Sequence, residues 1–408
     1  MQSSKLWNKD FLLYYIATGF STLGSYLTAT ALAYLILDRT QSTQNFAFTL
    51  AITAAAALFS PYAGSMVDRL KLKQFLAWGD FLRCFSLLLL IGFDFLGFFN
   101  IVFVYILVGF NAIISLFYRP AIGKLLPRLT GKDNLMQAYG LMGVLYNSAS
   151  ILGFLIGGFA VSFFGVQLTI VLDAISFFVM GIIFLLINTE QSAGNHNNQS
   201  DHDEGITPNV TIKATVQLMI SSGIIVCPLL IFLNQAFLAP YKIELPLLFD
   251  STVFGTFFAC YSVGTLCSSI LVSRFGERLY NYTTLFVSML VSPLIIFVSS
   301  NFQLPIFYFV TAAVIGFFSL TASTISFSVI QRLIPDQMMG KVYGIMGLIE
   351  DGGLPILFLI LGTVTGTVSM STILLGSSIV FLIITGVFIV VIRASHFFKV
   401  SEPSLELR

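Results

Sequence analysis

The sequence predicts an all-α integral membrane protein with twelve transmembrane helices arranged as two similar six-helix bundles. Hydrophobic residues make up 57% of its 408 residues and charged residues only 10%, whereas a soluble domain carries roughly 25% charge. The charges cluster and leave uninterrupted apolar runs of about 20 residues, the length that crosses a bilayer as a helix. A five-residue segment beginning at Tyr139 (Tyr-Gly-Leu-Met-Gly) returns at Tyr343 with one change, half a chain length later. This spacing indicates an internal duplication.

Twelve apolar segments follow one another along the chain. We expect the helices at residues 11–37, 44–67, 75–97, 100–122, 134–161, 167–188, 214–239, 251–273, 282–300, 304–330, 339–362 and 371–394. The first segment follows two lysines, as a signal peptide would, but it is too long for one and eleven more come after it. We therefore expect it to be retained as the first span.

The middle of the chain separates the two predicted bundles. It is rich in Asn, Gln, Ser, Gly, Asp and Glu and has no apolar period, which is typical of a flexible linker. The domains that follow are an N-terminal bundle at residues 1–189, a cytoplasmic linker at 190–213 and a C-terminal bundle at 214–408.

The lysines and arginines predict the orientation in the membrane. Seventeen of the twenty lie in the termini and in the connections on the same side as the termini, and such residues accumulate in the cytoplasm. Arg39 and Lys242 fall on the opposite side. We therefore expect a multi-pass protein of the cell membrane with both termini in the cytoplasm, and a monomer in the lipid bilayer. No basic stripe suits nucleic acid.

Signatures of catalysis and of bound cofactors are absent from the sequence. It has no nucleophile elbow, no phosphate-binding glycine loop and no zinc spacing, so we expect neither an enzyme nor a resident metal or cofactor. His196 and His202 lie near acidic residues, but their spacing fits no closed tetrahedral site. None of the four cysteines has a metal-ligand spacing, and all fall inside predicted spans as small apolar residues: Cys84, Cys227, Cys260 and Cys267.

The short loop between the second and third spans combines a glycine with charged residues. Gly64 precedes Asp68 by one helical turn, so a neighbouring helix can approach the glycine while the carboxylate emerges at the membrane edge. An aspartate there can interact with the positive end of another helix or with an arginine. Together with Arg69 and Lys73 it can act as a gate whose contact forms in one conformation only. The alternative is that these charges only set the topology.

This loop resembles the signature between spans 2 and 3 of the major facilitator superfamily, Gly-x-Leu-Ala-Asp-Arg-x-Gly-Arg-Lys. The four gating candidates named above match it, whereas Lys71 and Leu72 replace the Gly-Arg pair. The resemblance covers both halves of the chain and implies the major facilitator fold.

Further segments resemble the macrolide-efflux-like branch of the drug:proton antiporters within that superfamily. They begin at Ser21, Asp80, Tyr118 and Asp173. In the fifth span, Gly-Phe-Leu-Ile-Gly-Gly at residues 153–158 is similar to the antiporter motif Gly-Pro-x-x-Gly-Gly. Glycines at this spacing also let helices pack closely, which explains them without antiport. The resemblance to this branch implies export coupled to protons.

Charged residues inside the spans need an explanation, because each costs about 2.5–3.5 kcal/mol at the bilayer centre on insertion scales. Asp80 and Arg83 are three residues apart on one helical face, which predicts an internal ion pair that Arg119 can share. Asp173 lies about a turn and a half from the outer end of span 6. A hydrogen-bonded packing role and a transport role are both open for it.

Glu350 and Asp351 lie close to the middle of span 11 and are followed by Gly352, Gly353 and Pro355. Irregular backbone at that depth is tolerated only beside a cavity or within protein. The alternative is a pair of buried neutral carboxyls with a structural role. The repeat offset of 204 residues makes Asn147 the equivalent of Asp351 in the first half of the chain. Three other polar residues are deep enough in their spans to line a cavity: Asn111, Asn234 and Gln235.

These observations predict a secondary active exporter of a small amphipathic or apolar organic compound that works by alternating access and proton antiport. A coupling carboxyl must exchange its proton near neutral pH, and burial raises a carboxyl's pKa toward that range. Asp351 is the first candidate, Glu350 the second and Asp173 the third. Two alternatives remain: a nutrient or metal-chelate importer, and a non-transporting receptor or assembly factor with the same fold.

Overall fold

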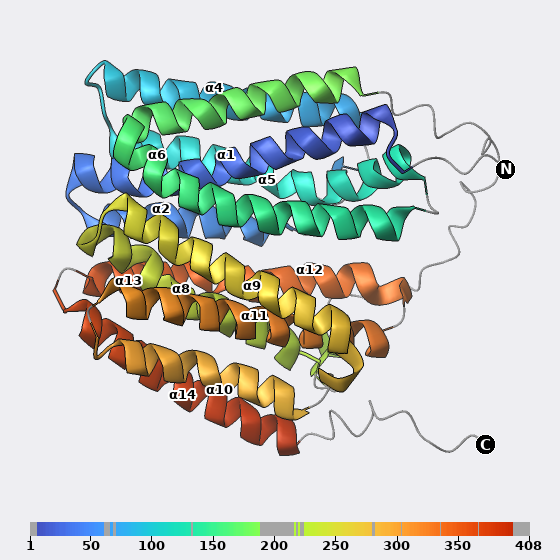
Figure 1. The fold of residues 1–408 in the computed structure, drawn as a ribbon, viewed down its shortest axis with the longest axis vertical. Coiled ribbons are helices and arrows are strands. Elements are labelled where there is room, and N and C mark those ends of the chain that lie inside the picture. Colours follow the sequence, from blue (N-terminus) through green and yellow to red (C-terminus); the bar gives the residue numbers. More distant parts are fainter. Residues whose placement is uncertain are drawn as a thin grey trace. The chain divides into compact units, whose positions relative to one another are not determined.

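The computed structural model describes residues 6–60, 66–67, 71–131, 134–187, 216–217, 219–220, 224–279, 282–302, 304–334, 336–365 and 367–394. These residues are almost entirely helical, and none of them forms a strand. Figure 1 labels the helices along the chain.

In the described part of the first half, the chain forms four long helices and one shorter one. They are α1 (Lys9–Thr40), α2 (Thr43–Ala55), which continues as the 3₁₀ turn η1 (Ala56–Phe59), α4 (Leu72–Phe95), α5 (Ile101–Thr130) and α6 (Leu135–Leu186). Asn8, Ser42 and Asn100 cap the first, second and fourth of these helices with side-chain oxygens that accept backbone N–H groups.

The helix α6 is two transmembrane segments joined without a loop. Gly165 breaks its 52 residues with φ 80° and ψ 168°, a backbone conformation that only glycine adopts readily. The two predicted spans at 134–161 and 167–188 thus correspond to the two halves of α6, which turn back at this glycine.

The second half of the chain forms seven helices among the residues described. They are α8 (Val226–Leu248), α9 (Ser251–Leu279), α10 (Tyr282–Ser299), α11 (Pro305–Leu333), α12 (Asp336–Gly352), α13 (Leu354–Val364) and α14 (Met370–Ala394). The helix is interrupted at Gly353, between the end of α12 and the start of α13. This is the loosened point that the glycine pair of span 11 predicts.

Nine helices in the described part of the chain are long and apolar enough to cross a membrane. One of them, Gln137–Leu186, is the double segment described above, and two shorter apolar helices cover Thr43–Phe59 and Thr283–Ser299. Each of the twelve predicted apolar segments therefore has a helical counterpart. The prediction of an all-helical, multi-pass membrane fold is confirmed.

Two predicted helix ends are wrong by about two turns. Span 4 was expected to stop at residue 122, but α5 continues to Thr130. Span 7 was expected to stop at residue 239, but α8 continues through Pro240 to Leu248. Prolines are tolerated in membrane helices because neighbouring groups satisfy the freed backbone carbonyl. Lys242, which was placed in an outer loop, therefore lies within α8, and so does Glu244.

The chain divides into two compact units. Unit 1 comprises residues 1–204 together with 245–259, and unit 2 comprises residues 205–244 together with 260–408. The predicted domain boundaries remain a prediction, and the linker at 190–213 lies outside the described residues.

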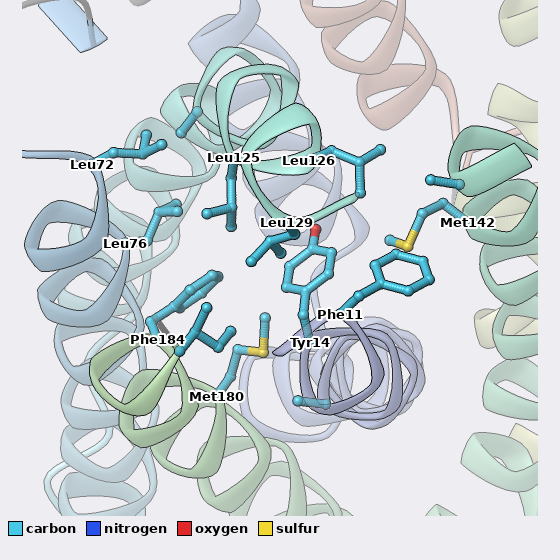
Figure 2. Packing of buried hydrophobic residues seen from close by; sticks show 14 of the residues in the cluster. Phe11, Tyr14, Leu72, Leu76, Leu125, Leu126, Leu129, Met142, Met180 and Phe184 are labelled. Carbon is cyan, nitrogen blue, oxygen red and sulfur yellow. The ribbon is translucent and has the colours of Figure 1, made fainter. Parts of the chain in front are cut away.

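One end of unit 1 contains a dense apolar core. Figure 2 shows side chains from four helices that converge there, with Phe11 and Tyr14 on α1, Leu76 on α4, Leu126 on α5 and Phe184 on α6. All five are fully buried or nearly so. This packing holds α1 against both halves of α6 and so sets the geometry of the polar groups farther along these helices.

The glycines of residues 153–158 form a close-packed seam in unit 1. A Cβ added at Gly153 would lie 2.7 Å from the Cβ of Tyr26, and one added at Gly157 would lie 3.2 Å from the Cα of Leu27. A Cβ at Gly158 would overlap the carbonyl oxygen of Ser251, whose hydroxyl donates to the Gly158 carbonyl at 2.8 Å. The packing interpretation of these glycines is therefore visible in the structure.

Candidate functional site

A cavity lies among the helices of unit 1. Its volume is about 190 Å³, smaller than the roughly 300–1,000 Å³ of sites for drug-sized ligands. The walls are mostly apolar, with a few polar groups contributed by five helical segments: Ser25 and Thr28 of α1, Thr53 of α2, Arg83 and Ser86 of α4, Asn111 and Ser115 of α5, and Asp173 of α6. Apolar walls with a few placed polar groups are typical of small-molecule sites.

Asn111 connects two helices at the wall of this cavity. Its amide nitrogen donates to the Ser86 hydroxyl at 2.5 Å and to the Leu107 carbonyl at 2.9 Å. The Ser86 hydroxyl in turn donates to the Arg83 carbonyl at 2.8 Å. The sequence-based candidate Asn111 thus lines the cavity and fixes α5 against α4.

Asp80 and Arg83 form the internal pair expected from their spacing. Arg83 Nη1 lies 3.7 Å from Asp80 Oδ1, which is within ion-pair range but longer than a hydrogen bond. The Arg83 guanidinium carbon lies 3.9 Å from the ring centroid of Phe177 and 5.3 Å from that of Tyr118. These are cation–π distances. The arginine is therefore held by two aromatic rings as much as by the aspartate.

Asp173 is the acid that faces the cavity. It is 1% exposed, and the Ser176 hydroxyl donates to its Oδ1 at 3.1 Å. A Cβ at Gly24 of α1 would lie 2.5 Å from the same oxygen. Gly24 thus provides the space that the carboxyl occupies between α1 and α6.

The acids of span 11 lie in unit 2, at the end of α12. Lys242 of α8 interacts electrostatically with Asp351, and its Nζ lies 6.0 Å from the ring centroid of Phe358. Glu244 of α8 accepts a hydrogen bond from the Thr365 hydroxyl at 2.7 Å. Unit 2 therefore holds several charged residues within helical segments that are long and apolar enough to cross a membrane. The position in unit 1 that is equivalent to Asp351 by the repeat is the uncharged Asn147.

The sequence prediction missed Lys242 and Glu244 as intramembrane residues. Both occur in an apolar run with Pro240 on one side and Pro246 on the other, and ending the helix at the first proline concealed them. The signal that could have found them is the continued hydrophobicity of α8 beyond Pro240.

The remaining predicted cavity residues do not line the unit 1 cavity. Asn147 donates to the Gly143 carbonyl one turn earlier in α6 at 2.9 Å. Asn234 is buried in unit 2, with its amide 3.5 Å from the Ser319 carbonyl. Gln235 is the next residue of α8 and is partly buried.

Several predicted residues lie where the structure makes no statement. Gly64, Asp68, Arg69 and the side chain of Arg119 are outside the described residues, whereas Lys73 is partly buried in the first turn of α4. Over the described ranges, no group of three or more His, Cys, Asp and Glu residues is placed to hold a metal ion.

Comparison with known families identifies the fold. A model of the Major Facilitator Superfamily matches residues 14–357, most of the chain. The chain belongs to the Major Facilitator Superfamily. Members of this superfamily are membrane transporters that bind small-molecule substrates. The prediction that the protein is a membrane transporter is therefore confirmed.

A curated relative aligns with most of this chain. An uncharacterized MFS-type transporter of Bacillus subtilis (strain 168), YkuC, is 21% identical over 362 residues, which cover 83% of this chain and 81% of the relative. The macrolide-efflux-like branch is not distinguished by these comparisons.

Solved structures of superfamily members share the fold. A mutant of the nucleoside transporter NupG aligns with a TM-score of 0.72 and 14% identity, over 93% of this chain and all of that one. A bacterial homologue of the iron transporter ferroportin, solved in an inward-facing state, aligns with a TM-score of 0.70 and 18% identity, over 94% of this chain and 98% of that one. An auto-inhibited POT family peptide transporter aligns with a TM-score of 0.71 and 12% identity, over 95% of this chain and 97% of that one. Identities this low establish the fold alone.

Proposed function

We propose that this protein is a secondary active exporter of a small amphipathic or apolar organic compound, working by alternating access and proton antiport. The observation that carries the proposal is the unit 1 cavity, with mostly apolar walls and a few polar groups that include one acid and one arginine. Such walls suit an organic ligand whose apolar part is buried and whose polar part is oriented by hydrogen bonds. The direction of transport rests on the similarity of residues 153–158 to the antiporter motif.

The proposal includes the setting in which export takes place. The protein is a monomer in the cell membrane with both termini in the cytoplasm, as the distribution of lysines and arginines favours. Gly64, Asp68, Arg69 and Lys73 form the cytoplasmic gate. Asp351 and Glu350 are the proposed coupling acids, with Asp173 as the third candidate.

Transport of a broad panel of fluorescent or radiolabelled compounds tests this function. Accumulation in energised cells should rise when the gene is deleted and fall when it is restored. The opposite sign for any compound would establish an importer. No change across the panel, with the protein present in the membrane, would favour the receptor or assembly factor.

Reconstituted vesicles separate export from secondary effects in cells. Purified protein in vesicles with an imposed pH gradient should move the exported compound uphill, and a protonophore should abolish that movement. Uphill movement that persists without any proton gradient would contradict proton antiport and leave the transporter class intact.

A further inference from the structure

A further cavity lies in unit 2, where three helices of the second half meet. Its volume is about 220 Å³, and it is lined by the end of α9, the start of α10 and the middle of α11. Leu271, Val287 and Phe317 each belong to one of these three walls. The residues proposed for coupling, substrate contact and gating do not line it, so the transport proposal leaves this cavity without a role.

The cavity extends from the membrane surface into the hydrocarbon region. The part of α9 that is apolar enough to cross a membrane ends at Phe275, and that of α10 begins at Thr283. Because the exposed Thr283 lines the cavity, one end of it lies at the level of the lipid headgroups. Thr321, on the α11 wall, lies nine residues before the apolar part of that helix ends at Ile330, or about 13 Å along the helix. That depth is close to half of the roughly 30 Å hydrocarbon core.

The walls present apolar surface although several of their residues carry hydroxyl groups. The Ser288 hydroxyl donates to the Thr284 carbonyl at 2.8 Å, and the Thr321 hydroxyl donates to the Phe317 carbonyl at 2.9 Å. These bonds use the hydroxyl hydrogens within the helices and leave methyl, methylene and aromatic groups to face the cavity. Val287 is 45% exposed within the apolar part of α10, so the cavity opens where this helix meets lipid. Such walls suit an acyl chain, which requires no hydrogen-bond partner.

A close crossing of α9 and α11 fixes the deep end of the cavity. A Cβ added at Gly264 would collide with the carbonyl oxygen of Ala313, and one added at Gly316 would collide with that of Tyr261. Phe317, which lines the cavity, directly follows Gly316. Since the two helices are already in backbone contact at this crossing, they cannot approach further to fill the space beside it. The cavity is therefore preformed.

Two arginines lie beside the surface end of the cavity. Arg274 and Arg278 are exposed near the end of α9, close in sequence to the lining residues Leu271 and Leu279. Together with Glu277, whose side chain is outside the described ones, they give this segment two positive charges and one negative charge, a net charge of +1. The first backbone N–H groups of α10 add the positive end of a helix dipole there. Arginine binds phosphate through paired hydrogen bonds, and basic pockets between membrane helices bind anionic lipid headgroups.

We propose that this cavity is a binding site for one phospholipid with a negatively charged headgroup. The phosphate lies against Arg274 and Arg278, and one acyl chain lies in the cavity between α9, α10 and α11. A zwitterionic headgroup binds less well, because its positive group is repelled by the arginines. The site belongs to unit 2 alone and depends on neither the substrate nor the coupling of transport.

Native mass spectrometry of the purified protein tests the headgroup. Protein released from nanodiscs with equal amounts of phosphatidylglycerol and phosphatidylcholine should retain one molecule of phosphatidylglycerol. Arg274→Gln and Arg278→Gln should each weaken this retention about fivefold, the usual contribution of one basic residue to binding an anionic lipid. Arg274→Lys keeps the charge and should keep most of the binding. Arg128→Gln, at an exposed arginine in the last turn of α5, is the matched control and should bind like the native protein.

A cavity-filling variant tests the position of the acyl chain. Val287→Trp places an indole ring at the opening and should weaken retention of phosphatidylglycerol as strongly as the loss of one arginine, although both arginines remain. Leu294→Trp is the matched control: Leu294 lies seven residues later on the same face of α10, is 48% exposed and does not line the cavity. Thermal unfolding midpoints of both variants establish that they are folded.

Four results would overturn the proposal. Equal retention of the two lipids would contradict the selectivity for charge, and native retention in both arginine-to-glutamine variants would contradict the role of the arginines. Native retention in Val287→Trp would place the lipid outside the cavity. Displacement of the lipid by excess inorganic phosphate would show that the site takes a soluble anion instead of a phospholipid. Because the readout is lipid binding, the outcome is independent of whether the protein exports a substrate.

Discussion

At the scale of single residues, buried charges have very different environments in this protein. Asp94 near the end of α4 is fully paired: its two oxygens accept from Arg39 at 2.7 Å and 3.1 Å, and a third hydrogen bond comes from Gln167 at 3.0 Å. The side chain of Asp94 is 0% exposed, and that of Arg39 is 39% exposed. This fork-shaped pair joins α1, α4 and the second half of α6.

Asp94→Asn should therefore destabilise unit 1. An amide cannot accept both arginine hydrogen bonds as strongly as a carboxylate, and losing hydrogen bonds to a charged group costs about 1.5–3 kcal/mol. Thermal unfolding of the purified variant in detergent should show a clearly lower midpoint. The exposed Asp38→Asn should change the free energy of unfolding by less than about 0.5 kcal/mol. Equal midpoints for the two variants would show that the pair contributes no stability.

Asp351→Asn tests the coupling role proposed for span 11. The variant should lose uphill export and its dependence on the pH gradient, yet still exchange substrate downhill, because an amide cannot carry the proton. Vesicle transport with and without a pH gradient measures both. If the amide variants of Asp351 and of Glu350 both keep pH-driven uphill transport, coupling lies elsewhere and Asp173 becomes the first candidate.

Asp68→Asn is the corresponding test of the proposed gate. The variant should slow transport while leaving membrane insertion and substrate binding largely intact, because only the contact that stabilises one conformation is lost. The measurement is initial transport rate per folded protein, compared with substrate binding to the same preparation. Transport at the native rate would mean that these charges only set the topology.

At the scale of elements, the glycines of α6 have distinct functions that depend on position. Gly165 permits the chain reversal with its positive φ. Gly158 permits contact with Ser251, whereas Gly140 faces open space, with no atom within 4 Å of a built Cβ. The same helix thus offers one glycine that packing requires and another that packing does not require.

Gly158→Ala and Gly140→Ala form a matched pair in α6. The Cβ of the first collides with backbone of residues 251–252, and such overpacking costs typically about 1–3 kcal/mol. The second should be neutral or stabilise by about 0.4–1 kcal/mol, because alanine reduces the entropy of the unfolded chain. Thermal midpoints of the two variants, measured side by side, should differ in this order. The reverse order would contradict the packing seen at the seam.

At the scale of the whole molecule, the superfamily fold accounts for the sparse charge and the twelve apolar segments. Much of the aromatic surface remains exposed in the isolated chain, including Phe95, Phe163 and Trp78. Exposed apolar side chains at this density need lipid around them, as the membrane assignment requires. The proposed dependence of export on the pH gradient is also a property of the whole molecule, because it requires both the coupling acids and alternating access. The vesicle experiment with an imposed pH gradient tests it.

The sequence alone determined the fold class, the approximate positions of the helices and the break in span 11. Hydrophobic run length, glycine and proline report directly on a membrane helix, because a bilayer requires every backbone polar group to be satisfied within the helix. The sequence also indicated the Asp80–Arg83 pair, since residues three apart share a helical face.

Only the tertiary structure decided which charges meet across helices. The Arg39–Asp94–Gln167 cluster, the approach of Asp173 to Gly24 and the stacking of Arg83 on Phe177 join residues that are 55 to 149 positions apart. Helical periodicity sets which face a side chain occupies, but which neighbour lies opposite depends on how the helices pack. Lys242 shows the same limit, because tolerance of Pro240 within α8 depends on the surrounding helices and not on the local sequence.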